Sequence, residues 1–172
     1  MTNTLLRACE DGDLDLAKRL VNEDKVDPCL PNIRDLTPLH MACWKGHLEM
    51  VKWLVGECKV NPELRNEDGD TPFPLACFKG HLEVAKWLVA ECKPDPNLPD
   101  YYGYTSLHGA CREGHLEVVK WLVDECKADL NQTNKNGETP IQLAGQNRQL
   151  KVIYWLIAKC DVTCKRKFEE IS

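Results

Sequence analysis

The sequence repeats itself every 34 residues, and this period restricts the chain to a fold built from similar stacked units. When the chain is shifted by 34 positions, residues 37–58 align with residues 71–92, and 15 of 22 positions are identical. Further copies begin at Thr105 and Thr139, and a more divergent copy begins near Asn3. The copies therefore fall approximately at 3–36, 37–70, 71–104, 105–138 and 139–172.

Each copy carries local signals for two helices and a turn. Thr37 followed by Pro38 is typical of an N-cap residue and the first helical position, and Gly46 suits the left-handed residue that ends a helix. The segment that follows His47 has apolar residues at helical spacing, which predicts a second helix. The Asp-Gly pair in "NEDGD" (66–70) predicts a tight turn. The unit is therefore helix, turn, helix and hairpin-like loop.

Neither predicted helix is long enough to persist alone, because isolated helices shorter than about 12–15 residues are marginal in water. Stacked neighbours must supply the stability, and the terminal units then need more polar outer faces. Arg19 stands where the later copies have tryptophan, such as Trp53, and Arg148 with Gln149 replaces the last Gly-His pair. We therefore expect the first and fifth copies to cap the stack.

These units resemble ankyrin repeats. The family pattern T-P-L-H-x-A stands here as "TPLHMA" (37–42), and "GHLEVVKWLV" from Gly114 matches the second helix of the family. The resemblance covers residues 3–172 and implies an all-α repeat protein, a solenoid of stacked helix-turn-helix units joined by hairpin-like loops, in a single domain over 1–172. The period is 34 residues where the family has 33, with the extra residue near Cys58, Cys92 and Cys126, so the shape of that loop is left open.

Cysteine and histidine four residues apart, as in "ACWKGH" (42–47), have the composition of a metal-ligand pair, and the pair recurs in two later copies. Packed helices lie about 8–10 Å apart, which is too wide for disulfides, whose Cα atoms lie about 4.4–6.8 Å apart, and for zinc, whose ligand atoms lie about 2.0–2.3 Å from the metal. We therefore expect no metal site, and we expect these cysteines to pack as small hydrophobic residues. They are Cys9, Cys43, Cys77 and Cys111.

Three cysteines stand outside this ladder: Cys29, Cys160 and Cys164. Cys29 has no counterpart in the other copies, and the other two lie four residues apart in the last copy. A reactive or metal-capturing thiol among them stays open as an alternative, and exposure is the observation that decides it.

Other repeated residues are expected to be structural. The resemblance implies that His40 and His108 make structural hydrogen bonds, and Pro74 in the equivalent position is expected to cost one cap bond to Thr71. The tryptophans that recur once per copy are expected to pack between units. They are Trp53, Trp87, Trp121 and Trp155.

Composition excludes several classes of partner. The net charge is −5 and the pI is near 5.6, so the chain has no basic field that would attract nucleic acid or anionic lipid. The first residues lack the pattern of a signal peptide, and no apolar run approaches the roughly 20 residues that cross a bilayer. We expect a monomer with free thiols in the cytosol or the nucleus. We expect no cofactor and no catalysis, because no phosphate-binding loop or nucleophilic triad pattern stands out.

Function is expected where the copies differ, because positions common to all copies are explained by stacking. In the resemblance, the variable residues lie on the hairpin tips and on the first helix, both facing a concave surface. Aromatic residues and arginine are typical of binding hot spots. We expect a protein partner on this surface, at Trp44, Lys45, Asp68, Asp70, Phe78, Lys79, Tyr101, Tyr102, Tyr104, Arg112 and Glu113. The alternative, that the aromatic side chains fold down onto adjacent loops, stays open.

The leading interpretation is a non-catalytic protein-protein interaction module that binds its partner through the concave face. Two alternatives are a thiol-based redox or metal sensor that uses the cysteines outside the core, and a stable scaffold without a natural partner.

Overall fold

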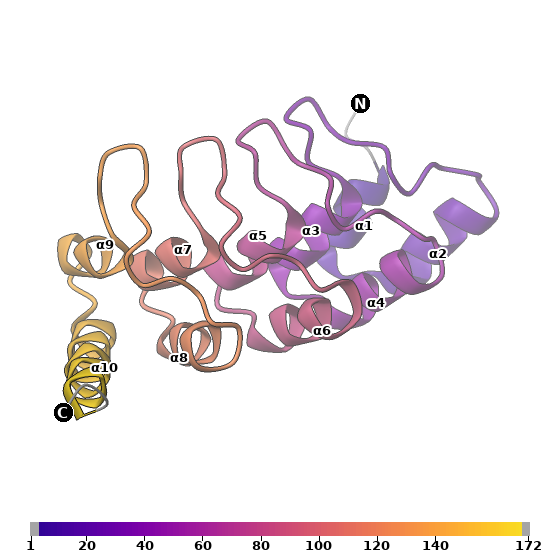
Figure 1. Ribbon diagram of the computed structural model, residues 1–172. Coiled ribbons are helices and arrows are strands. Elements are labelled where there is room, and N and C mark those ends of the chain that lie inside the picture. The colour runs from indigo at the N-terminus through magenta and orange to yellow at the C-terminus, as the bar shows by residue number, and fades with distance from the viewer. Residues whose placement is uncertain (1–3, 170–172) are drawn as a thin grey trace.

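The computed structural model describes the backbone of residues 4–169 and the side chains of residues 4–160. Within this range the chain is all-α, without strands, and forms helices in consecutive pairs (Figure 1). The pairs are α1 (Thr4–Asp11) with α2 (Leu14–Asn22), α3 (Pro38–Lys45) with α4 (Leu48–Gly56), α5 (Pro72–Phe78) with α6 (Leu82–Cys92), α7 (Ser106–Glu113) with α8 (Leu116–Asp124), and α9 (Pro140–Gln146) with α10 (Leu150–Glu169).

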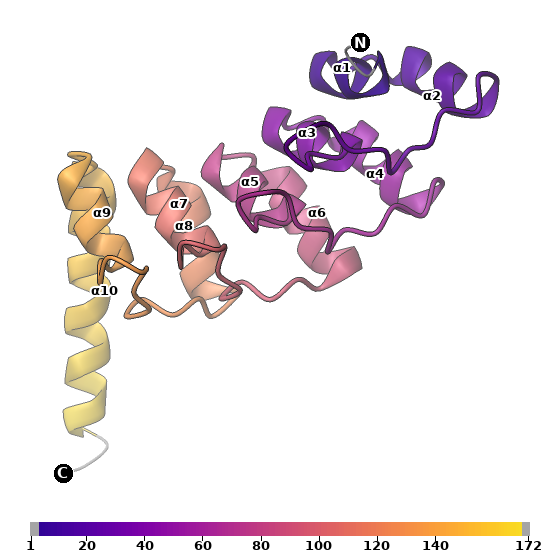
Figure 2. The same ribbon diagram turned by 90° about the horizontal axis from the view of Figure 1, so that it is seen from above.

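The pairs stack side by side. The first helices α1, α3, α5, α7 and α9 form one row in which each contacts the next, and the second helices form another row (Figure 1). The loops between pairs project as hairpins beside the row of first helices, and the stack curves along its length (Figure 2). This arrangement confirms the predicted solenoid of helix-turn-helix units.

The predicted helix boundaries are confirmed at both ends of the first helices. Thr37 caps α3 by accepting from the backbone N–H of His40, and the helix ends at Gly46 with φ 80°. At α5, where Pro74 replaces the histidine, the N-cap Thr71 makes no side-chain cap bond, as the sequence predicted. Local sequence signals therefore decide where these helices begin and end.

The cysteines of the first helices lie in the core. Cys9, Cys43, Cys77 and Cys111 are each 0% exposed, and they pack among alanine, leucine and valine side chains of adjacent units. Trp53 is also buried, and the other three repeated tryptophans pack half-buried against the core. Both predictions of core packing are confirmed. The side chains act as spacers whose size matches the distance between units.

Histidines tie each unit to the one before it. His81 Nε2 lies 3.1 Å from the carbonyl oxygen of Trp44, near the end of the preceding first helix, and its ring lies against Gly46. A Cβ built on Gly46 would lie 2.4 Å from His81 Nδ1, so glycine is required there by space as well as by its positive φ. Gln149, which sequence suggested only as a polar cap, donates to the carbonyl oxygen of Arg112 at 3.1 Å in the same way.

The extra residue of the 34-residue period closes the end of the second helix. After α4, Lys59 adopts a left-handed conformation with φ 57°, and the N–H of Val60 donates to the carbonyl oxygen of Leu54 at 3.0 Å. This is the bonding of a Schellman motif with lysine where glycine is usual. Lys127 occupies the same position after α8, and its ammonium donates to the carbonyl oxygen of Asp124. Lysine at this position thus satisfies the negative end of the helix.

The hairpins share one hydrogen-bonding scheme. In the second unit Asn66 Oδ1 accepts from the backbone N–H groups of Asp68 and Asp70, and Gly69 has φ 89°. The N–H of Tyr101 in the next hairpin donates to the carbonyl oxygen of Asp68 at 2.9 Å. Successive hairpins are therefore linked through their backbones, which fixes the direction in which their tip residues point.

The positive φ at the end of the first helices predicts opposite effects on stability for two substitutions at equivalent positions, Gly46 and Arg148. Gly46→Ala places a Cβ against the ring of His81 and holds alanine at positive φ, so we expect it to lower the free energy of unfolding by roughly 2 kcal/mol or more. Arg148 has φ 58° at the equivalent position of the last copy, so Arg148→Gly should raise the free energy of unfolding by roughly 0.5–1 kcal/mol. Urea unfolding measures both, and equal effects of the same sign would contradict the stacking role of this glycine.

Candidate partner-binding surface

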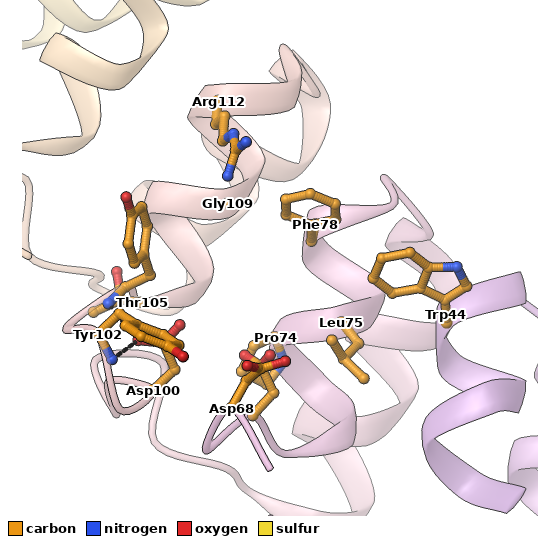
Figure 3. Close-up of a pocket in the computed structure, with 12 residues that line it drawn as sticks. Trp44, Asp68, Pro74, Leu75, Phe78, Asp100, Tyr102, Thr105, Gly109 and Arg112 are labelled. Carbon is orange, nitrogen blue, oxygen red and sulfur yellow. Dashed lines mark hydrogen bonds between the residues drawn. The ribbon is translucent and has the colours of Figure 1, made fainter. Parts of the chain in front are cut away.

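A pocket of about 320 Å³ opens between the hairpins and first helices of the second, third and fourth units. We call it the central pocket (Figure 3). Seven of the predicted site residues line it: Trp44, Asp68, Asp70, Phe78, Tyr102, Tyr104 and Arg112. Five lining residues were not predicted from sequence: Pro74, Leu75, Asp100, Thr105 and Gly109. The structure therefore brings most of the predicted residues to one hollow.

The aromatic wall of the central pocket comes from neighbouring first helices. The rings of Trp44 on α3 and Phe78 on α5 are stacked, with centroids 5.6 Å apart and planes at 17°. Lys79 does not line the pocket, and its ammonium lies over these rings, 4.1 Å from the centroid of Trp44 and 5.2 Å from that of Phe78. The exposed wall is thus an aromatic pair that attracts a positive charge.

The three tyrosines on the hairpin of the third unit are placed differently. Tyr102 is 55% exposed and lies at the mouth of the central pocket (Figure 3). Tyr104 is half-buried and packs edge-on against His108, with centroids 5.9 Å apart. Tyr101 lies on Gly69 of the preceding hairpin beneath the guanidinium of Arg65 and does not line the pocket. Tyr101 thus packs partly on an adjacent hairpin, as the alternative describes, yet it is 52% exposed, so both Tyr101 and Tyr102 present surface that a partner can contact.

The two remaining predicted residues take part in ion pairs at the ends of first helices. Lys45 lies 3.0 Å from a carboxylate oxygen of Glu10, and Glu113 lies 3.9 Å from Arg112. Neither lines the central pocket. Exposed pairs of this kind contribute little to stability. Glu113 is thus joined to the pocket through Arg112, whereas Lys45 is paired with a residue of the first unit.

Three carboxylates line the hairpin side of the central pocket: Asp68, Asp70 and Asp100. Burial, with smaller contributions from the neighbouring carboxylates of Asp100 and Asp68, raises the pKa of Asp70 to about 6, against the lowering effects of Asn66 and Arg65. Burial also raises the pKa of Asp100, although the backbone N–H groups that it accepts from oppose the shift. The negative charges are thus partly withdrawn from water and repel one another.

Gly109 is the lining residue that the sequence comparison could have found. It stands on α7 where the other copies have larger residues: Arg7, Met41, Leu75 and Leu143. A Cβ at Gly109 would lie 3.1 Å from Cδ2 of Phe78, so the missing side chain helps to open the hollow between α5 and α7. The signal was a small residue in one copy at a position occupied by large residues in the others.

Asp100 was not predicted as a site residue, because its carboxylate also makes the hydrogen bonds that the hairpin needs. Its Oδ1 accepts from the N–H groups of Tyr102 and Tyr104 at 2.8 Å each (Figure 3), which is the hairpin scheme described above. The other copies use asparagine for this role: Asn32, Asn66 and Asn134. An amide oxygen is sufficient for these bonds, so the negative charge of Asp100 is an addition found at this position only in the third unit.

The cysteines outside the ladder differ in exposure. Cys160 is exposed, whereas Cys29 is half-buried, and burial with a minor contribution from Asp27 raises the pKa of the Cys29 thiol. The side chain of Cys164 lies outside the described residues. Among the side chains that the structure describes, no group of three or more His, Cys, Asp or Glu residues could hold a metal ion. A sensor would therefore depend on Cys160 in this part of the chain.

The raised pKa of Asp70 predicts a stability that depends on pH. The carboxyl group of Asp70 faces Asp68, Asp100 and Arg65, and its folded pKa lies above the unfolded value of 3.8. The folded state then binds more protons between pH 4 and 6, so stability falls as the pH rises through this window. We expect Asp70→Asn to raise the free energy of unfolding by roughly 1–2 kcal/mol at pH 7.5 and by about half as much at pH 5. Urea unfolding at both pH values checks this, and a loss of stability at pH 7.5 would contradict it.

The exposures of the thiols predict their order of reaction. In the native protein at pH 7, a water-soluble maleimide should label Cys160 first, because it is exposed. Cys43 should be labelled only after unfolding, because it is fully buried and burial raises its pKa well above the ordinary value. Peptide mapping by mass spectrometry after timed labelling distinguishes the two sites. Equal labelling rates in the native protein would show that the core is not closed.

Comparison with known proteins agrees with the architecture. A family model described as ankyrin repeats (3 copies) matches residues 5–100 and 90–166. No curated protein matches the sequence at a significant level. The family match spans nearly all of the helix pairs seen in the structure. The chain therefore belongs to the ankyrin repeat family.

Proposed function

We propose that this chain is a non-catalytic module that binds a protein partner through the central pocket and its rim. Ankyrin repeats are generally protein-protein interaction modules, which supports this class of function. We further propose that the five units act as one domain and that the chain is a monomer. The observation that carries the proposal is the exposure of Tyr102 beside the stacked pair of Trp44 and Phe78 at one hollow.

Packing against the repeated core does not account for the aromatic residues of the central pocket. The repeated tryptophans pack against the core, whereas the rings of Trp44, Phe78 and Tyr102 line a hollow and differ from copy to copy. Large aromatic side chains bury much area with few torsions to order, and they cluster at the centres of interfaces. These residues therefore have the chemistry and the central position of a binding hot spot.

His40 and His108 both make structural hydrogen bonds, which supports a non-catalytic function. His40 Nδ1 accepts from the backbone N–H of Thr37, so its proton lies on Nε2 and is donated to the carbonyl oxygen of Asp70 at 3.2 Å. His108 makes the equivalent contacts with Thr105 and Glu138. Burial lowers the pKa of both rings, so they stay neutral at pH 7. Neither ring lines the central pocket, and each joins one unit to the next.

The buried charge of Asp70 opposes the alternative of a scaffold without a partner. A chain selected for stability alone has no reason to keep a carboxylate whose ionisation is opposed by burial and by neighbouring carboxylates. Other copies place different residues at this position, among them Leu36 and Tyr104. Residues that lower stability at one surface are typical of sites kept for binding.

None of the helices in the described residues is long and apolar enough to cross a bilayer.

Affinity measurements on two variants test the proposed surface. Trp44→Ala removes a half-buried ring and Tyr102→Ala an exposed one, both at the central pocket, and we expect each to weaken binding of a captured protein partner roughly 10- to 30-fold. The partner is recovered from a cell lysate on immobilised wild-type protein, purified, and measured by calorimetry. Circular dichroism and urea unfolding confirm that the variants keep their fold.

A matched control uses the opposite side of the stack. Tyr154 lies on α10 in the last unit and is 70% exposed. It is next to the half-buried Trp155, and neither residue lines the central pocket. Tyr154→Ala removes an exposed tyrosine as Tyr102→Ala does, and it should leave the affinity unchanged. A partner that binds all three variants as it binds the wild type would show that the central pocket is not the binding surface.

A further inference from the structure

The central pocket has two chemically different ends. Asp68 and Asp100 lie toward the hairpins, and Arg112 lies toward the end of α7 (Figure 3). Asp70 also lines the pocket and belongs to the same hairpin as Asp68. The side chain of Phe78 lies between these ends, and Leu75 lies beside Asp68 and Pro74. Complementarity therefore asks for a positive group at the hairpin end and does not favour one beside Arg112.

The carboxylates at the hairpin end are not neutralised by the protein itself. Within residues 4–160, no ion pair joins Asp68, Asp70 or Asp100 to a lysine, arginine or histidine. The guanidinium of Arg65 donates to the carbonyl oxygens of Gly69 and Pro99 at 2.8 and 3.1 Å. These hydrogen bonds hold Arg65 to the backbone of two hairpins. Arg65 offsets part of the charge of Asp70 without an ion pair, and the rest of the negative charge is available to a group from outside.

The charge at this end exceeds what the hairpins require. Asparagine supplies the same two backbone hydrogen bonds in the other copies that Asp100 supplies here. Asp70 likewise contributes its backbone carbonyl to His40, a role that needs no carboxylate. Three acidic residues between adjacent hairpins repel one another and lie partly out of water. A positive group placed between them removes this repulsion, which is a source of affinity.

The size and the walls of the central pocket suit one long side chain. A volume of about 320 Å³ is at the small end of the range of ligand pockets, roughly 300–1,000 Å³. Phe78, Leu75 and Pro74 give the hollow apolar walls that pack against a methylene chain, and Tyr102 stands beside the carboxylates. An apolar stem with a charged head is the form of lysine and arginine. The aromatic rings also attract such a head, as the position of Lys79 over Trp44 illustrates.

We infer that the central pocket receives one lysine or arginine side chain of the protein partner, with its charged head between Asp68, Asp70 and Asp100 and its stem along Phe78 and Leu75. This inference rests on the proposed function and specifies the chemistry of the partner. Arg112 then faces a neutral or acidic residue beside the inserted one. The partner segment thus carries a basic residue that is not followed by a cluster of further positive charges.

A phage-displayed library of random peptides, selected on the full chain, tests this chemistry directly. We expect the selected peptides to share a lysine or arginine. In a synthetic peptide, the shared arginine is replaced by citrulline, or the shared lysine by norleucine, which removes the charge and keeps the length. We expect this change to weaken binding to the wild-type protein roughly 10- to 30-fold.

The same peptides are then measured on the variant Asp70→Asn/Asp100→Asn. Asparagine keeps the acceptor oxygen that the hairpin needs at position 100 and removes the charge at both positions. The difference in affinity between the charged and neutral peptides should be much smaller on this variant, because two of the three carboxylates that face the inserted charge are neutral and only Asp68 remains. The control Glu83→Gln/Glu117→Gln changes the net charge by the same amount on the exposed faces of α6 and α8, and it should preserve the full difference between the peptides.

Two further outcomes overturn the inference in different ways. Selected peptides that lack a basic residue, and that lose affinity on Trp44→Ala or Tyr102→Ala but not on the asparagine variant, would overturn the inference and leave the proposed function standing. Selected peptides that bind the wild type and all of these variants equally would overturn both. A difference between charged and neutral peptides that persists in full on the asparagine variant would place the basic residue elsewhere.

Discussion

The helices of this chain are too short to be stable alone, and the rest of the structure follows from that constraint. The first helices have 7 or 8 residues, below the roughly 12–15 at which an isolated helix becomes even marginal in water. Each unit therefore depends on contacts with its neighbours. The buried cysteines and the bonds from His47 to Glu10 and from His81 to Trp44 supply these contacts at one interface after another. These residues can be replaced only by side chains that make the same contact between units. Gln149 is such a replacement, because it stands where other copies have histidine and donates to the preceding unit.

The same constraint separates binding from stability. Side chains that face a neighbouring unit are nearly the same in every copy, whereas the tips and the outer positions of the first helices carry residues that stacking does not need. The central pocket arises from such differences between adjacent copies. Gly109 leaves space beside Phe78, and Asp100 adds a charge to a hydrogen-bonding scheme that asparagine completes equally well in other copies. A site in a solenoid is thus made by small departures on a repeated frame.

Most of the fold could be predicted from the sequence, because the period and the capping residues act locally. Thr37 and Gly46 identify the ends of α3 without knowledge of any other unit. The left-handed lysines could not be predicted in this way, since Lys59 carries no residue preference for positive φ and its conformation is imposed by the Schellman bond of Val60. The site was predicted in part. Tyr101 and Tyr102 are adjacent and identical in chemistry, and only the packing of Tyr101 on Gly69 distinguishes them.

A pocket, unlike a helix end, is a property of volumes that belong to several units. Its lining could be read from the sequence only by asking, at each repeated position, which copy has the smallest or the most charged residue. That comparison finds Gly109 and Asp100, because the residues that stack the units are nearly the same in every copy and these two differ from their counterparts. It also explains why the acidic end of the pocket is tolerated. The energy of the stack is spread over many interfaces, so one unit can hold Asp70 in an unfavourable ionised state without unfolding. The repeated frame therefore supplies stability that offsets the cost of the charged pocket.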